Sequence, residues 1–122
     1  MYNQSTQWQD LPILEVNYLE MVAMGDKEII KELLMIFHQD TADRIITLSQ
    51  AIDSGEEEVV FRMLHTIKGA SAQVGACQVE AISFELENDA RKGLFSDIRD
   101  ALPQLSAAFK ILSAELDKRG YL

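Results

Sequence analysis

The sequence contains few of the residues that break helices or cross-link chains. Of its 122 residues only six are Gly, two are Pro and one, Cys77, is Cys. A single cysteine excludes an internal disulfide and any metal site that needs a cysteine pair, and we expect Cys77 to be a small core residue. The scarcity of Gly and Pro, beside abundant Leu, Ala, Glu, Ile and Met, favours helices over strands.

The chain also lacks long apolar runs and an excess of positive charge. No apolar stretch approaches the roughly 20 residues that cross a bilayer. The first ten residues, MYNQSTQWQD, have neither the basic start nor the apolar centre of a secretory signal. Acidic residues outnumber basic ones by 20 to 11, which gives a net charge of −9 and disfavours nucleic acid and anionic membranes as partners. We therefore expect a cytoplasmic protein that binds neither.

What the sequence does contain is a series of amphipathic helical segments, in which apolar residues recur at three- and four-residue steps. The segments cover about 14–24, 27–53, 56–74, 77–92 and 96–118. Each of the first four ends at a glycine, and Asp26 has the side chain of a helix N-cap. Pro103 falls inside the last segment, where it predicts a kink or a break.

Short connections between long helices favour antiparallel neighbours. The expected fold is all-α: an antiparallel up-down-up-down four-helix bundle with a short extra N-terminal helix. We assign residues 14–120 to this single domain and expect residues 1–13 to form a loosely ordered N-terminal extension. Because the apolar stripes can be buried inside one bundle, we expect a monomer.

The residues with the clearest chemical meaning lie in the segment 56–74. On a helix, one stripe of this segment is apolar or small and is the expected core side: Val60, Leu64, Ile67, Ser71 and Val74. A second group of side chains adjoins along a different side, at three- and four-residue spacings: Phe61, His65, Lys68, Gly69 and Ala72.

This second group has a chemical use. An imidazole clear of the core can act as a nucleophile near neutral pH, because much of it is unprotonated. The ammonium of Lys68, one turn on, can reach phosphoryl oxygens attached to His65 and offset their charge. Gly69 costs a helix roughly 1 kcal/mol relative to Ala, which close approach by another surface would explain. Phe61 adds an apolar contact, and Ala72 extends the surface of small side chains that begins at Gly69.

The stretch HTIKGASAQVGA, residues 65–76, resembles the signature of the histidine phosphotransfer (HPt) family. In that signature the histidine is followed by Lys-Gly at the third and fourth positions, then by small residues and a Gly near the helix end. Residues 37–52 and 84–91 are similar to the family's neighbouring helices, and the resemblance covers about 16–116. Ala70 stands where many members carry a Ser, which removes only a possible hydrogen bond.

The resemblance implies a four-helix bundle whose histidine accepts a phosphoryl group from a receiver-domain aspartate and passes it to another, without autokinase activity. On that basis His65 is the expected phosphoacceptor, through Nε2. Lys68 is expected to orient the phosphoryl group, and Gly69 to keep the approach open.

Three further residues are weaker candidates that follow from the same resemblance. Gln39 and Glu87 lie on helices expected to flank His65, where the family often carries polar residues that bond or steer the imidazole. Glu87 is equally compatible with a solvated helix charge. Arg91, one turn beyond it, is a candidate contact for the acidic rim of a receiver.

The sequence gives no sign of a cofactor or metal of its own, since it has no Gly-rich phosphate loop and no aspartate cluster. We expect Mg²⁺ to come from the receiver, and the partners to be response-regulator receivers and a hybrid sensor kinase. His38 is expected at the surface or at the boundary of the core.

Two other function classes remain compatible with the residues. One is an interaction bundle that keeps the histidine without transferring phosphate. The other is an enzyme with His65 as general base, for which no acid partner or substrate cleft can be read nearby. Both a free-standing protein and a fragment of a hybrid kinase fit the sequence.

Overall fold

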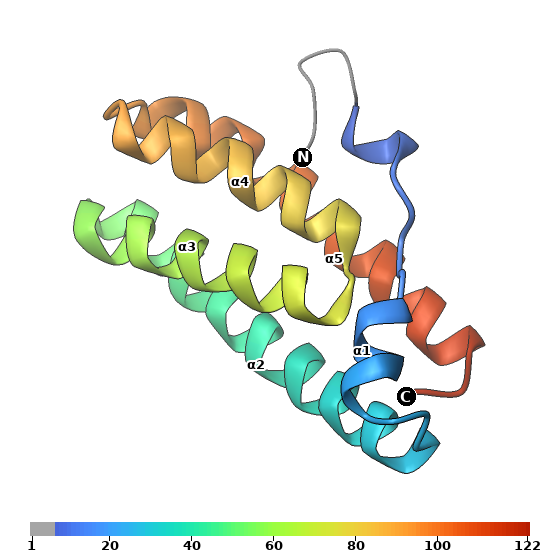
Figure 1. Cartoon of the computed structure of the whole chain (residues 1–122). Coiled ribbons are helices and arrows are strands. Elements are labelled where there is room, and N and C mark those ends of the chain that lie inside the picture. Colours follow the sequence, from blue (N-terminus) through green and yellow to red (C-terminus); the bar gives the residue numbers. More distant parts are fainter. Residues whose placement is uncertain (1–6) are drawn as a thin grey trace.

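The computed structural model describes residues 7–122 as helices joined by short turns (Figure 1). In chain order the elements are a 3₁₀ turn η1 (Trp8–Asp10), α1 (Asn17–Val22), α2 (Lys27–Ser54), α3 (Glu57–Val74), α4 (Cys77–Arg91) and α5 (Phe95–Lys118). No strand occurs within residues 7–122, which confirms the all-α expectation. None of the helices in this part of the chain is long and apolar enough to cross a membrane.

Helices α2 to α5 form a closed four-helix bundle. Each of them packs against the next one in the chain, α5 returns to α2, and consecutive helices run in opposite directions (Figure 1). The core contains one buried stripe from each helix, represented by Leu34, Leu64, Leu86 and Leu112, none more than 1% exposed. The expected up-down-up-down bundle with a short N-terminal helix is therefore confirmed.

Local signals in the sequence set the helix ends. The carboxylate of Asp26 accepts hydrogen bonds from the N–H groups of Glu28 and Ile29 at 3.0 and 3.3 Å, which confirms the expected N-cap. Gly55 and Gly75 follow α2 and α3 with φ angles of 71° and 80°, a left-handed conformation that glycine adopts without a steric penalty.

The helical prediction differs from the structure in two places. Helix α1 is shorter than the predicted 14–24, because the N–H of Glu15 donates to the carbonyl of Gly75 at 2.8 Å and holds the chain before Asn17 outside the helix. Of the kink or break predicted at Pro103, the break does not occur, because Ile98 and Leu105 are fully buried on either side of the proline and hold both parts of the helix against the core.

Residues 7–16 form an N-terminal strap that packs against the bundle. Trp8 is 6% exposed, and its Nε1–H donates to Oε1 of Gln104 on α5 at 3.1 Å. Nε2 of Gln78, on α4, donates to the carbonyls of Gln9 and Leu11 at 3.4 and 3.0 Å. Residues 7–13 therefore differ from the expected loosely ordered extension over 1–13, whose first six residues lie outside the described part of the chain.

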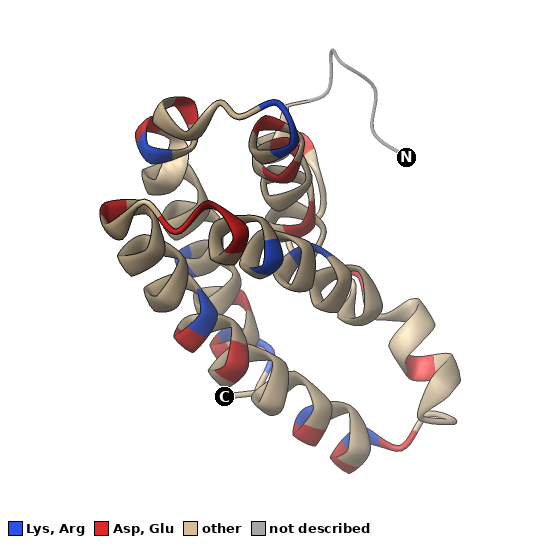
Figure 2. Ribbon diagram, turned by 90° about the vertical axis from the view of Figure 1, so that its left-hand side faces the viewer, with Lys and Arg blue, Asp and Glu red and all other residues tan. Residues whose placement is uncertain are grey.

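Charged side chains are spread along the helices, and one turn of the bundle is strongly acidic (Figure 2). Asp53 and the run Glu56, Glu57 and Glu58 surround the turn between α2 and α3. The first turn of α3 thus carries negative charge at the positive end of its helix dipole, which is stabilising.

Cys77, expected in the core, is only half-buried, because it is the first residue of α4, at the end of the bundle.

Candidate functional site

His65 lies in the middle of α3 with its imidazole at the surface. Its side chain is 59% exposed, because the buried stripe of α3, which contains Leu64 and Ile67, faces the core instead. The Nδ1 atom of His65 lies 2.6 Å from Oε2 of Glu87 on α4. A carboxylate can only accept, so Nδ1 is the donor of this hydrogen bond, and in the neutral imidazole this tautomer carries the lone pair on Nε2.

Glu87 is a buried carboxylate that joins three side chains of the site. The residue is 1% exposed, and its Oε1 lies 2.6 Å from Nζ of Lys68. Its Oε2, besides the contact with His65, lies 3.2 Å from a guanidinium nitrogen of Arg91. Burial by itself raises the pKa of the Glu87 carboxyl, but hydrogen bonds and charge from Lys68 and His65 outweigh it and leave the pKa below its ordinary value. The carboxylate is therefore ionised at neutral pH.

The aromatic ring of Phe61 lies on one side of the imidazole. It stacks on His65 with the ring centroids 6.1 Å apart and the planes 12° from parallel. The guanidinium carbon of Arg91 lies 4.9 Å from the centroid of the same ring, which is a cation–π contact. Phe61, His65, Glu87 and Arg91 are thus brought together where α3 and α4 pack side by side, as Figure 1 shows for the two helices.

Lys68 follows His65 by three residues on α3, about one helical turn, and only 25% of its side chain is exposed. Its Nζ is 5.8 Å from the ring centroid of Phe84 on α4. Phe84 was not among the residues that the sequence suggested for the site. The signal that points to it is its position three residues before Glu87, which places both side chains on one face of α4.

Gly69 and Ala72 form a low, exposed surface beyond Lys68 on α3. A Cβ added to Gly69 would meet nothing within 4 Å. No neighbour within residues 7–122 therefore requires a glycine at this helical position, although alanine would favour the helix by about 1 kcal/mol.

Gln39 does not lie with these residues. It is exposed on α2 and lines a hollow whose other residues come from α2 and from Leu122, with none from α3 or α4. Both Phe37 and Thr41 are buried, and Gln39, two residues from each, lies about 200° around the helix from them. The helix that carries Gln39 does pack against α3, but Gln39 lies on the side of α2 away from it, so the structure does not bring Gln39 to the imidazole.

The second histidine, His38, lies at the boundary of the core, as expected. Its Nε2 is 2.7 Å from Oγ of Ser113 on α5, and its ring stacks on Phe109 with the centroids 4.9 Å apart. Burial lowers the pKa of this imidazole. His38 is therefore held between α2 and α5, while His65 stands exposed on α3.

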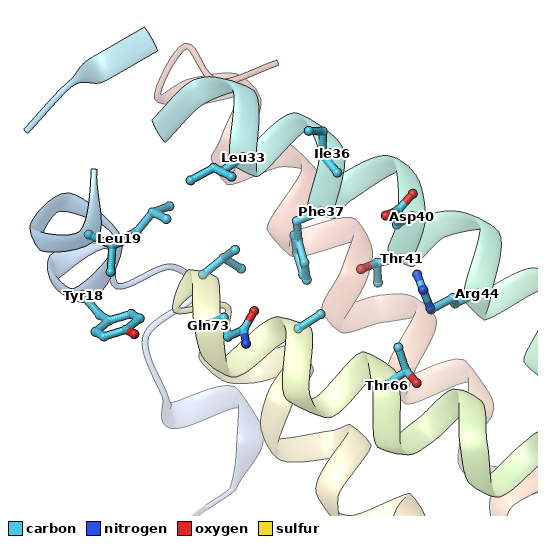
Figure 3. A pocket seen from close by; sticks show the side chains of 13 residues that line it. Tyr18, Leu19, Leu33, Ile36, Phe37, Asp40, Thr41, Arg44, Thr66 and Gln73 are labelled. Atoms are coloured by element: carbon cyan, nitrogen blue, oxygen red, sulfur yellow. The ribbon is translucent and has the colours of Figure 1, made fainter. Parts of the chain in front are cut away.

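A groove of about 400 Å³ borders α3 on the side away from α4 (Figure 3). Apolar residues of α1 and α2 line one end, including Tyr18, Leu33 and Phe37, and Asp40 and Arg44 line the other. The α3 wall of the groove consists of Thr66, Ala70, Gln73 and Val74, and the first three directly follow His65, Gly69 and Ala72 in sequence. The groove therefore adjoins the side of α3 that carries His65, about 100° around the helix.

No group of three or more His, Cys, Asp or Glu side chains within residues 7–122 is arranged to hold a metal ion. The site combines one exposed imidazole, two cations and one buried carboxylate. Such a set can accept and hold an anionic group on the imidazole.

Comparisons with known proteins agree with this geometry. The family model of the Hpt domain matches residues 32–115. Among solved structures, the chain is similar to histidine-containing phosphotransfer protein B (HptB) from Pseudomonas aeruginosa PAO1, with a TM-score of 0.81 and 24% identity over 90% of this chain and 96% of that one. A search of curated proteins finds no match.

The chain therefore belongs to the Hpt domain family. It is a histidine phosphotransfer module of phosphorelays, an intermediate that interacts with receiver domains.

Proposed function

We propose that His65 is the residue through which this chain relays phosphoryl groups between receiver-domain aspartates. The observation that carries this proposal is the 2.6 Å hydrogen bond from Nδ1 to Glu87, on an imidazole that is 59% exposed. The Nε2 lone pair attacks the phosphorus of the aspartyl phosphate; the N–P bond forms as the P–O bond to the aspartate breaks, and the aspartate leaves as a carboxylate. The Nδ1 proton stays in the hydrogen bond to Glu87 throughout.

Two cations beside the imidazole support the same proposal. Lys68 and Arg91 both rest on the Glu87 carboxylate, so the three side chains together carry one net positive charge. A phosphoryl group on Nε2 brings close to two negative charges, which these cations partly offset. An ammonium has three N–H groups, so Lys68 can keep its bond to Glu87 and still donate to a phosphoryl oxygen.

The receiver is proposed to dock on the surface formed by Phe61, Gly69 and Ala72 and on the adjoining groove. A standard interface covers about 800 Å² on each partner, a patch of roughly 16 Å radius. Gln73 lies eight residues from His65, which is about 12 Å along α3. An interface centred on His65 therefore reaches the α3 wall of the groove. Mg²⁺, with most of the stabilisation of the transferring group, would come from the receiver's acidic pocket.

An aspartate in place of Ile36 is expected to weaken receiver binding about ten-fold without changing stability. Ile36 lines the groove on α2 and is 52% exposed, so the change removes apolar contact area and buries a charge in the complex. The matched control is Ile111→Asp, because Ile111 is 38% exposed on α5, the helix diagonally opposite α3. Titration calorimetry with a receiver compares the two variants, and equal affinities would remove the groove from the interface.

Removal of the Glu87 carboxylate is expected to slow phosphoryl acceptance. A hydrogen bond to a charged group contributes about 1.5 to 3 kcal/mol, which corresponds to a roughly 10- to 100-fold slower reaction in Glu87→Ala if the bond orients the attacking imidazole. Glu87→Gln keeps an oxygen that accepts from Nδ1, so its loss should be smaller. Initial rates of label transfer test this order, and equal rates in all three proteins would contradict an orienting role.

The lowered pKa of Glu87 predicts that the free energy of unfolding depends on pH. Its pKa in the folded chain lies below the ordinary value of 4.5, so the ionised carboxylate stabilises the fold above that value. This contribution is lost as the pH falls through the lowered pKa. Urea unfolding at neutral and acid pH should therefore show a smaller loss of stability on acidification in Glu87→Gln than in the wild type.

Transfer from phosphorylated receivers tests the proposed function directly. A panel of receiver domains carrying radioactive aspartyl phosphate is mixed with the chain, and the product is treated with acid and with alkali. Phosphohistidine is labile in acid and stable in alkali, and peptide mapping should place the label on His65. Label on another residue would overturn the assignment, and no transfer from any receiver would favour the phosphate-free interaction bundle.

The proposal includes how the chain is loaded and in what state it acts. We infer that it has no autokinase activity, so Mg²⁺ and labelled ATP alone should leave it unlabelled, and that it receives its phosphoryl group from a hybrid sensor kinase in the cytoplasm. The apolar stripes of α2 to α5 are used inside one bundle, which supports a monomer. Sedimentation analysis would settle that state.

A further inference from the structure

One large side chain beside the candidate site has no part in the proposed transfer reaction. Phe84 lies on α4 and is 41% exposed, outside the buried core of the bundle. Its ring nevertheless contacts the site, because Nζ of Lys68 lies over it. Phe84 also precedes Glu87 by three residues, on the same face of α4.

The ammonium of Lys68 is held from two directions. Oε1 of Glu87 lies 2.6 Å from Nζ, and the centroid of the Phe84 ring lies 5.8 Å from the same atom. The second distance is within the range at which an aromatic ring attracts a cation. Because only 25% of the lysine side chain is exposed, Lys68 is not a freely moving surface charge.

We propose that Phe84 is a positioning residue that acts through Lys68. The ring and the Glu87 carboxylate together keep the ammonium beside His65, so that it is already in place when a phosphoryl group reaches Nε2. A lysine has a long flexible stem, and without the ring it would have to be ordered during each transfer. The ring uses no strong hydrogen-bond acceptor to do this, so an N–H of Lys68 stays available for a phosphoryl oxygen. This inference rests on the proposed role of His65 and Lys68.

The other cation of the site supplies an internal comparison. Arg91 lies over the ring of Phe61, 4.9 Å from its centroid, just as Lys68 lies near the ring of Phe84. Both cations bond to Glu87, on different oxygens. Phe61 is thus a ring of the same kind at the same site whose partner is Arg91 rather than Lys68, which makes Phe61→Leu the matched control for Phe84→Leu.

The contact itself is tested by proton NMR of the free chain. A ring current from Phe84 should shift the ε-methylene protons of Lys68 to lower frequency. The shift should disappear in Phe84→Leu, persist in Phe84→Tyr and persist in Phe61→Leu. Lysine signals unchanged by Phe84→Leu would overturn the proposal without any reference to phosphoryl transfer.

The consequence for the reaction is tested with phosphoramidate, a small phosphoryl donor that needs no docking surface. Phe84→Leu should lower the rate of His65 labelling about two- to five-fold, the factor that corresponds to a partly exposed cation–π contact, and Phe84→Tyr should restore it. In a Lys68→Gln background Phe84→Leu should change nothing further, whereas the factor caused by Phe61→Leu should be the same in both backgrounds.

The outcomes separate this inference from the proposed function. An equal loss from Phe84→Leu with and without Lys68 would mean that the ring does not act through the lysine, and an unchanged rate in the wild-type background would mean that it does not act at all. Either result, with wild-type His65 still labelled, rejects only the role of Phe84. A wild-type chain that takes no label on His65 would reject the proposed function and this role with it.

Discussion

Replacing His65 by glutamine is expected to reduce phosphoryl acceptance to background. The amide of glutamine has no nucleophilic nitrogen lone pair, so nothing remains to form the N–P bond, whatever the receiver and its Mg²⁺ contribute. The fold should be unaffected, because His65 is 59% exposed and its one hydrogen bond within residues 7–122 is that from Nδ1 to Glu87. Label transfer from a phosphorylated receiver, with circular dichroism on the same sample, measures both properties.

The control for this prediction is the second of the two histidines. His38→Gln should accept label at the wild-type rate, because His38 lies between α2 and α5 with its Nε2 bonded to Ser113. Persistent acid-labile label on His65→Gln would contradict the assignment of His65 as the phosphoacceptor. Loss of label in His38→Gln as well would mean that the loss is not specific to His65.

Alanine at Gly75 is expected to lower the free energy of unfolding by about 3 kcal/mol. The φ angle of 80° costs a residue with a Cβ about 1 to 2 kcal/mol. The new Cβ would also overlap the backbone carbonyl of Glu15. Since that neighbour is backbone, the strap must move and lose its hydrogen bond to Gly75, a further contribution of about 1 kcal/mol. Thermal unfolding should shift downward by roughly 10 °C.

Gly55→Ala is the matched control for the stability prediction. Gly55 has a φ angle of 71°, and a Cβ there would meet nothing within 4 Å, so only the backbone strain of about 1 to 2 kcal/mol applies. The difference between the two variants measures the close approach of the strap. Equal destabilisation by the two substitutions would mean that the strap contributes nothing to the requirement for glycine at 75.

Helices and their ends were predictable because their causes are local. The apolar stripe of α3, from Val60 to Val74, is buried as its spacing indicated, and Asp26 and the glycines end or begin helices through their own backbone and side-chain preferences. The late start of α1 and the packing of residues 7–13 depend on distant partners, Gly75, Gln78 and Gln104. No pattern within those first residues contains that information.

The α3 part of the site was predictable for the same reason, and the α4 part was not. His65, Lys68 and Gly69 share a helix, so their spacing alone places them together. The burial of Glu87 depends on how α4 is rotated against α3, which the sequence left open between an orienting carboxylate and a solvated charge. The structure brings Glu87 to the imidazole and Arg91 to Glu87. The position of Phe84 near Lys68 depends on the same rotation of α4. The expectation for Gln39 could have been avoided, because its apolar neighbours on α2 already indicated that Gln39 lies on the outer side of that helix.

Trp8 gives the N-terminal strap a fluorescence signal of its own. It is the single tryptophan of the chain, and its indole is buried with the N–H bonded to Gln104. Its fluorescence therefore reports the environment of the strap, while circular dichroism at far-ultraviolet wavelengths is dominated by α2 to α5. Detachment of the strap and melting of the bundle are thus two separately visible events in the unlabelled protein, and the order in which they occur reveals whether the strap unfolds as part of the bundle or independently of it.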